Sequence, residues 1–126
     1  MESRAIGNEE YVSQYGSRQT GMPVFWDRPR PQDVDGLSAL LGKLSPAAAR
    51  SRVRRAGAPV PADGVRYARV GELRARSFAV DHTPWPGNSL HVSIRYRGMW
   101  DDEVAGRFEA CFTKPVWHEE PGGGRG

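Results

Sequence analysis

Six residues between positions 81 and 95 have side chains that can bind ligands or move protons. They are Asp81, His82, Asn88, His91, Ser93 and Arg95. A carboxylate or a second imidazole beside a histidine changes its charge and orientation, which is how general acid–base sites are built. The sequence contains no complete catalytic set. One hypothesis is therefore a small hydrolase or toxin-like enzyme that uses His91 with Asp81 or His82.

The segment that follows has the alternation of a β-strand. Apolar residues at positions 90, 92, 94 and 96 alternate with His91, Ser93 and Arg95, so these three side chains are expected on one face. A phosphoester site of the paired His-x-Ser/Thr type needs a second copy across a cleft. The remaining pair, His82-Thr83, is followed by Pro84 in a loop, and the pattern is incomplete. An exposed strand face also carries such residues merely because it meets water.

The loop at 81–88 holds Trp85 between Pro84 and Pro86. A tryptophan on a stiff loop is typical of an interface anchor, because it concentrates binding energy and loses little entropy on binding. The alternative is a lid folded over the core. Our leading hypothesis is an accessory or interaction module that binds a protein partner. Its expected binding residues are Trp85, Asn88, His91, Ser93 and Arg95.

A basic run suggests a third function. Arg50, Arg52, Arg54 and Arg55 precede further arginines up to position 76, and the chain has a net charge of +3 with a pI near 9.4. Nucleic-acid binding would follow if these side chains converged on one face. The alternative is a solvated helix face. Only two of the 18 basic residues are lysines, a bias that a GC-rich genome also produces.

Metal and cofactor sites are not expected. Cys111 is the single cysteine, so neither an intramolecular disulfide nor a cysteine-based zinc cage can form. It shares an apolar stripe with Val104 and Phe108, where a thiol behaves as a small hydrophobe. The N-terminal segment is polar, and no apolar run approaches the roughly 20 residues that a membrane helix needs. We therefore expect a cytoplasmic protein without membrane contact.

The 126 residues suit one α+β domain. Leucines spaced by three and four from Val34 to Leu44 predict a helix, and the helical region is expected to continue to residue 56. A second helix is predicted at 101–113, with one or two helical turns at 71–76. Strands at about 65–70, 77–80 and 90–97 predict a small, largely antiparallel sheet of three to four strands. Residues 1–22 are predicted to be a mobile arm, 23–117 the single domain, and 118–126 a flexible Gly-rich tail.

Two parts of the chain together resemble a loose group of small bacterial proteins from high-GC genomes. One is Gly64-Val65 followed by Val70-Gly71-Glu72-Leu73-Arg74 and Phe78-Ala79-Val80; the other is the run from Pro84 to Ile94. The shared order is a short strand–helix–strand, a Pro-Gly-Asn loop and a strand that begins with histidine. The resemblance covers residues 60–97 and implies an α+β unit. The group has no settled activity, so the resemblance implies no reaction.

Overall fold

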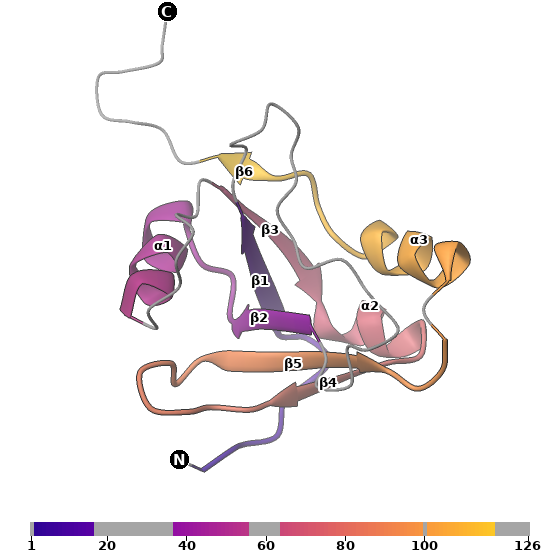
Figure 1. Ribbon diagram of the computed structural model, residues 1–126, viewed down its shortest axis with the longest axis horizontal. Helices are drawn as coiled ribbons and strands as arrows, with labels where there is room; N and C mark the ends of the chain where they lie inside the picture. The colour runs from indigo at the N-terminus through magenta and orange to yellow at the C-terminus, as the bar shows by residue number, and fades with distance from the viewer. Residues whose placement is uncertain (1, 17–36, 56–63, 100, 118–126) are drawn as a thin grey trace, which may run out of the picture.

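The computed structural model describes residues 2–16, 37–55, 64–99 and 101–117. These residues form one six-stranded antiparallel sheet and three helices, in an α+β arrangement (Figure 1). The sheet order is β4-β5-β2-β1-β3-β6. In chain order the elements are β1 (Tyr11–Gly16), β2 (Leu37–Leu41), α1 (Pro46–Arg55), β3 (Gly64–Arg69), α2 (Val70–Ala75), β4 (Phe78–His82), β5 (His91–Tyr96), α3 (Asp102–Ala110) and β6 (Val116–Trp117).

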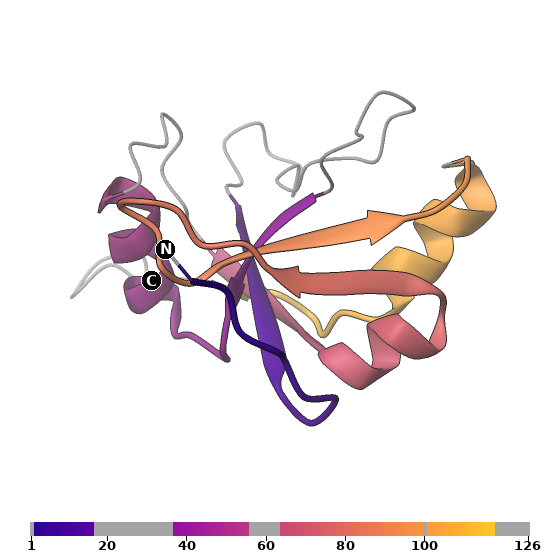
Figure 2. The same ribbon diagram turned by 90° about the horizontal axis from the view of Figure 1, so that it is seen from below.

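The two faces of the sheet are covered by different helices. The sheet is strongly twisted, so that β2, β4 and β5 run across the direction of β1 and β3 (Figures 1 and 2). Along β3, Val65 and Tyr67 join a small cluster with Ala49 of α1. Ala68, and Val70 just after it, join the larger cluster that includes residues of α2 and α3. Because successive strand residues point to opposite faces, α1 lies on one face and α2 and α3 on the other.

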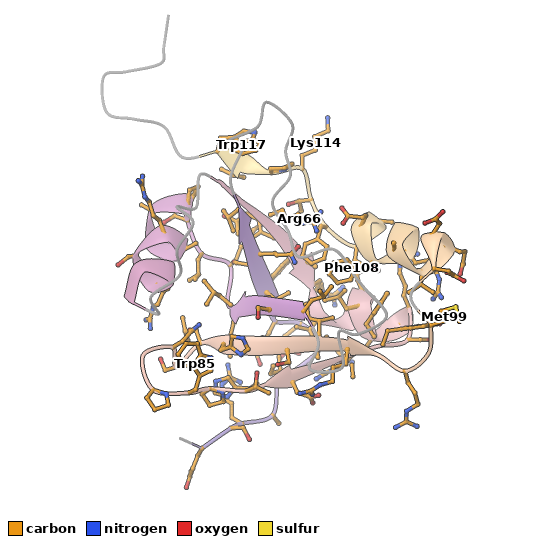
Figure 3. All side chains as sticks on the ribbon, viewed as in Figure 1. Arg66, Trp85, Met99, Phe108, Lys114 and Trp117 are labelled. Atoms are coloured by element: carbon orange, nitrogen blue, oxygen red, sulfur yellow. The ribbon has the colours of Figure 1, made fainter. Side chains whose placement is uncertain are left out.

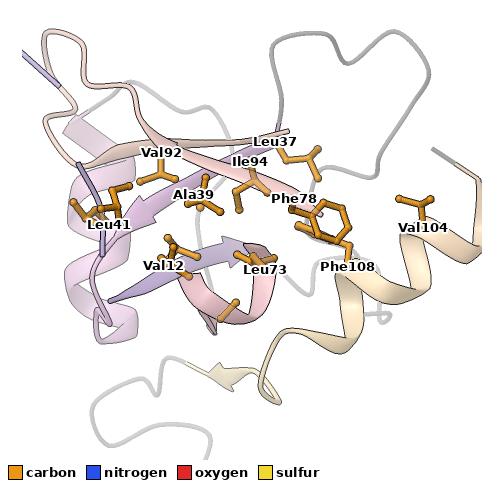
Figure 4. Close-up of a cluster of buried hydrophobic side chains, with 14 residues drawn as sticks. Val12, Leu37, Ala39, Leu41, Leu73, Phe78, Val92, Ile94, Val104 and Phe108 are labelled. Atoms are coloured by element: carbon orange, nitrogen blue, oxygen red, sulfur yellow. The ribbon is translucent and has the colours of Figure 1, made fainter. Parts of the chain in front are cut away.

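The larger cluster is the main core (Figure 4). Phe78 of β4 and Phe108 of α3 meet edge to face with ring centroids 5.5 Å apart, a favoured aromatic geometry. Val104 and Phe108 are buried, and Cys111 packs against the same cluster. The apolar stripe predicted for residues 101–113 is thus the inner side of α3.

The predicted sheet of three to four strands is too small, because β1, β2 and the two-residue β6 were not predicted as strands. The leucine spacing from Val34 predicted a helix, yet Leu37–Leu41 is strand β2. Leu37, Ala39 and Leu41 enter the main core while Leu40 enters the α1 cluster, so both faces carry buried apolar residues and only Ser38 is exposed. A short strand buried on both faces is apolar almost throughout, and its leucines match helical spacing equally well.

The expectation of a mobile arm over residues 1–22 does not hold for Tyr11–Gly16, which form β1 between β2 and β3. The segment looks polar, but its polar side chains have partners inside the fold. Ser13 Oγ donates to the Gly42 carbonyl at 2.6 Å and accepts from the Leu44 amide at 2.9 Å. Gln14 Oε1 accepts from Arg66 Nε at 2.9 Å. Residues 17–22 and the predicted tail lie outside the described residues.

The other predicted elements agree with the structure to within a few residues. The strands at 65–70, 77–80 and 90–97 are β3, β4 and β5, and the helical turns at 71–76 are α2. The later part of the predicted 34–56 helical region is α1. No helix in the described part of the chain has the length and apolar character needed to cross a membrane.

Candidate functional site

The residues singled out on β5 belong to a polar face made by β4, β5 and β2. Ser38 is paired with Ser93, and Leu40 with His91, across β2 and β5. Ser93 is also paired with Asp81 across β4 and β5. Paired residues point to the same side of the sheet. Since Leu40 packs in the α1 cluster, these polar side chains are on the side of the sheet that α1 covers in part. We call this surface the polar face; it comprises Ser38, Asp81, Thr83, His91, Ser93 and Arg95.

His91 is at the centre of a hydrogen-bond network on the polar face. Its Nε2 lies 3.0 Å from Ser38 Oγ. Its Nδ1 lies 2.8 Å from Thr83 Oγ1 and 3.1 Å from the Thr83 carbonyl oxygen. The Thr83 carbonyl oxygen only accepts hydrogen bonds, and the Thr83 hydroxyl can accept from Nδ1 while donating to Ser93 Oγ at 2.8 Å; we therefore infer that Nδ1 carries the proton of the neutral ring. Nε2 is then the acceptor, and Ser38 donates to it.

Burial lowers the pKa of His91 below its ordinary value of 6.5, and the nearby His82 lowers it slightly further. The hydrogen bond to the Thr83 carbonyl acts in the opposite direction but is the smaller effect. The imidazole is therefore neutral at pH 7, in the tautomer that the Thr83 carbonyl selects. A neutral imidazole whose Nε2 lone pair accepts the Ser38 hydroxyl is able to take up a proton at that nitrogen.

His82 and Asp81 do not make the predicted pairs with His91. His82 is on the opposite side of β4 from Asp81: its Nδ1 accepts from the Arg4 amide at 3.0 Å, and Nε2 donates to the Ser89 carbonyl at 2.8 Å. Asp81 Oδ2 instead lies 3.3 Å from Arg95 Nη1, in an exposed ion pair. The hydrogen-bond partners of the His91 ring are Ser38 and Thr83.

The sequence patterns did not predict Ser38 and Thr83 as partners of His91, for two different reasons. Ser38 lies in a segment predicted to be helical, so its position opposite β5 was hidden. Thr83 was grouped with His82 and the loop, although it continues the alternation of Ala79 and Asp81 along β4. Reading Leu37–Leu41 as a strand between two glycines, Gly36 and Gly42, would have been the available signal for Ser38.

A tight turn presents Trp85 at one end of β5. The Trp85 amide donates to the Asn88 carbonyl at 3.2 Å, and the Asn88 amide donates to the Trp85 carbonyl at 2.8 Å. Pro86 and Gly87, with Gly87 at a φ of 90°, suit the two central positions of a type II turn. Trp85 is 41% exposed, and its ring centroid lies 6.1 Å from that of His91. Trp85 is a member of neither core cluster.

The five predicted binding residues differ in how much surface they offer. Trp85 is exposed, the Arg95 side chain is 43% exposed, and His91 is half-buried. Asn88 and Ser93 are each only 6% exposed. The backbone of Asn88 closes the turn, while Ser93 Oγ lies 2.8 Å from Thr83 Oγ1. Trp85, Arg95 and His91 are therefore the predicted residues that offer most surface for direct contact with a partner.

The arginines between positions 50 and 76 whose side chains the structure describes do not all lie on one face. Arg66 is buried, forms an ion pair with Glu109 and stacks 4.4 Å from the Phe112 ring centroid. Arg74 donates to the Ile6 and Val80 carbonyls at 2.7 and 3.1 Å. Arg50 and Arg52 are on α1, across the sheet from α2. Arg54 and Arg55 end α1, and their side chains lie outside the description.

The described residues contain no group of three His, Cys, Asp or Glu side chains arranged to hold a metal ion. The candidate site is the polar face, with the His91 imidazole at its centre, the Ser38 and Thr83 hydroxyls hydrogen-bonded to that ring, and the exposed Trp85 indole at one end. Comparison with protein-family models, curated proteins and solved structures gave no match to this chain.

Proposed function

We propose that this protein is an interaction module that docks a protein partner on the polar face, with Trp85 as the anchor. The observation that carries the proposal is the placement of Trp85. A large aromatic side chain is held 41% exposed by a two-residue turn, next to a ring with which it is already in contact. Such an anchor loses little conformational freedom on binding.

The surroundings of Trp85 support docking on the face of the sheet. His91 is half-buried beside the indole, and Arg95 and Asp81 form an exposed ion pair on the same side. An aromatic anchor flanked by polar and charged groups is the usual composition of a transient protein interface. The exposed charges would contribute mainly to orientation and association rate.

The edge of β4 is less suited to binding by strand addition. Arg74 already occupies the Val80 carbonyl at 3.1 Å, and the Arg4 amide contacts the His82 ring at 3.0 Å. A docked strand would have to displace both contacts before pairing with β4. A partner that docks on the polar face does not have to displace either of these two contacts.

The test is capture from a lysate of the native host by the wild-type protein and by a Trp85→Ala variant. The control is Met99→Ala, because Met99 is 75% exposed and lies at the other end of β5 (Figure 3). We expect one partner to be retained by the wild type and by Met99→Ala but lost by Trp85→Ala. With the purified partner, removal of the anchor should weaken binding by about 2 kcal/mol, or roughly 30-fold.

Thermal unfolding of the three proteins shows whether the loss is specific. Since Trp85 is outside the core clusters, Trp85→Ala should unfold within a few degrees of the wild type. The proposal is contradicted if the wild type retains nothing beyond what Trp85→Ala retains. It is equally contradicted if Trp85→Ala loses binding only because the domain unfolds.

A further inference from the structure

A serine hydroxyl lies against the acceptor nitrogen of His91. Ser38 Oγ is exposed and 3.0 Å from Nε2, while Nδ1 faces the Thr83 carbonyl at 3.1 Å. With the ring proton fixed on Nδ1, the lone pair of Nε2 points at the Ser38 hydroxyl. This is the geometry in which an imidazole removes the proton of an attacking serine.

The ring is held in that geometry from more than one side. The Thr83 carbonyl orients Nδ1–H, as a third group orients the base in other serine–histidine pairs. The Thr83 amide also donates to the His91 carbonyl at 2.9 Å, which keeps the two residues in register. Ser38 lies on β2, hydrogen-bonded directly to β5, so nucleophile and base are both carried by regular strands.

We propose that Ser38 is a nucleophile, with His91 as its general base, and that it accepts the acyl group of small aryl esters. The indole of Trp85, 6.1 Å from the His91 ring, supplies an apolar surface beside the pair for an aryl group. The proposal goes beyond partner docking and does not depend on it, because the pair is formed by side chains of this chain alone.

The reaction needs no further reagent than the ester and water. Ser38 Oγ forms a bond to the acyl carbon as its proton passes to His91 Nε2. The bond from that carbon to the aryloxy oxygen then breaks, and the imidazolium returns the proton to the leaving group. Water, deprotonated by the same nitrogen, later releases the carboxylic acid and restores Ser38.

The experiment mixes the full chain with p-nitrophenyl acetate and measures p-nitrophenol release and acetylated peptides by mass spectrometry. We expect an acetyl group on Ser38, no such adduct in Ser38→Ala, and release by that variant at the level without protein. Ser51→Ala, which changes an exposed serine of α1, should behave as the wild type. His91→Gln should slow acetylation of Ser38 by about 100-fold, the usual contribution of a general base.

The pH profile separates a base from a residue that merely supports the strand. Acetylation should rise with pH and reach half its maximum below 6.5, because burial lowers the pKa of His91. If Ser38→Ala releases p-nitrophenol as fast as the wild type, or if the acetyl group is found only on other residues, the proposal is wrong. Neither result would contradict the proposal that a partner binds through Trp85.

Discussion

At the scale of single residues, His91 shows how a histidine acquires a defined tautomer without a carboxylate. One ring nitrogen meets a backbone carbonyl and the other a serine hydroxyl. Since the carbonyl has no proton to give, it decides which nitrogen is protonated. Asp81, the carboxylate expected to do this, is paired with Arg95 instead. The network is neutral and polar, which suits both a binding surface and a proton acceptor.

Protonation of His91 should destabilise the fold. The pKa of His91 is lowered in the folded chain. As the pH falls below 6.5, His91 therefore binds a proton more readily in the unfolded chain than in the folded chain. The stabilising contribution is complete above 6.5 and is lost as the pH falls through 6.5 toward the folded pKa. Urea unfolding between pH 7.5 and 5.5 should show this loss in the wild type and less of it in His91→Gln.

Nuclear magnetic resonance titration gives the direct measurement. The His91 ring signals of the folded protein should titrate with a midpoint below 6.5, and those of the urea-unfolded protein close to 6.5. A folded midpoint at or above 6.5 would contradict the conclusion that burial lowers the pKa of His91 in the folded chain.

At the scale of elements, sequence patterns predicted those elements whose apolar residues recur with one period, including β3, which is buried on both faces but alternates because of its arginines. β3, β4, β5 and α3 were found because their apolar residues recur with a single period. β2 was not found, since both of its faces carry buried apolar residues and its leucines therefore have no distinct period. β1 was not found, since its buried Ser13 and Gln14 read as solvent-exposed. The polar residues on β5 were therefore predicted, but the neighbouring strand that carries Ser38 was not.

Capping of α3 provides a test at the same scale. Asp101 accepts a hydrogen bond from the Val104 amide at 2.9 Å, as the N-cap of the helix that carries Phe108 into the core. Asp101→Ala should lower the free energy of unfolding by about 1 kcal/mol, measured by urea denaturation. Asp101→Asn keeps a capping oxygen and should lower it much less. Equal losses in the two variants would show that charge, and not capping, is responsible.

At the scale of the whole molecule, residues 4–10 tie separate elements together. The Val70 and Gly71 amides, at the start of α2, donate to the Glu10 and Asn8 carbonyls at 2.8 and 2.9 Å. These contacts satisfy amides at a helix start that has no side-chain cap. Arg74 links the carbonyl of Ile6, which is itself in the core, to that of Val80 on β4. The N-terminal segment is thus part of the domain.

Glu10 fixes this segment through its side chain as well as its backbone. Its carboxylate accepts from both terminal nitrogens of Arg4, at 2.8 and 3.1 Å, and from the Gly7 amide at 2.8 Å. The hydrogen bonds from Arg4, followed by that from Gly7, lower the pKa of Glu10 from 4.5 to about 2. Ionised Glu10 therefore favours the folded state, because the unfolded chain binds a proton more readily.

The stability that Glu10 contributes should be complete above pH 4.5 and should disappear as the pH falls toward 2. Glu10→Gln removes this dependence, so its free energy of unfolding should lie below that of the wild type at pH 6 and approach it near pH 2. Glu9→Gln, at the exposed neighbouring carboxylate, controls for the loss of one negative charge. Denaturant titrations of the three proteins at several pH values make the comparison. If the difference between Glu10→Gln and the wild type stays constant across that range, the Arg4–Glu10–Gly7 contacts do not stabilise the folded chain through the charge of Glu10.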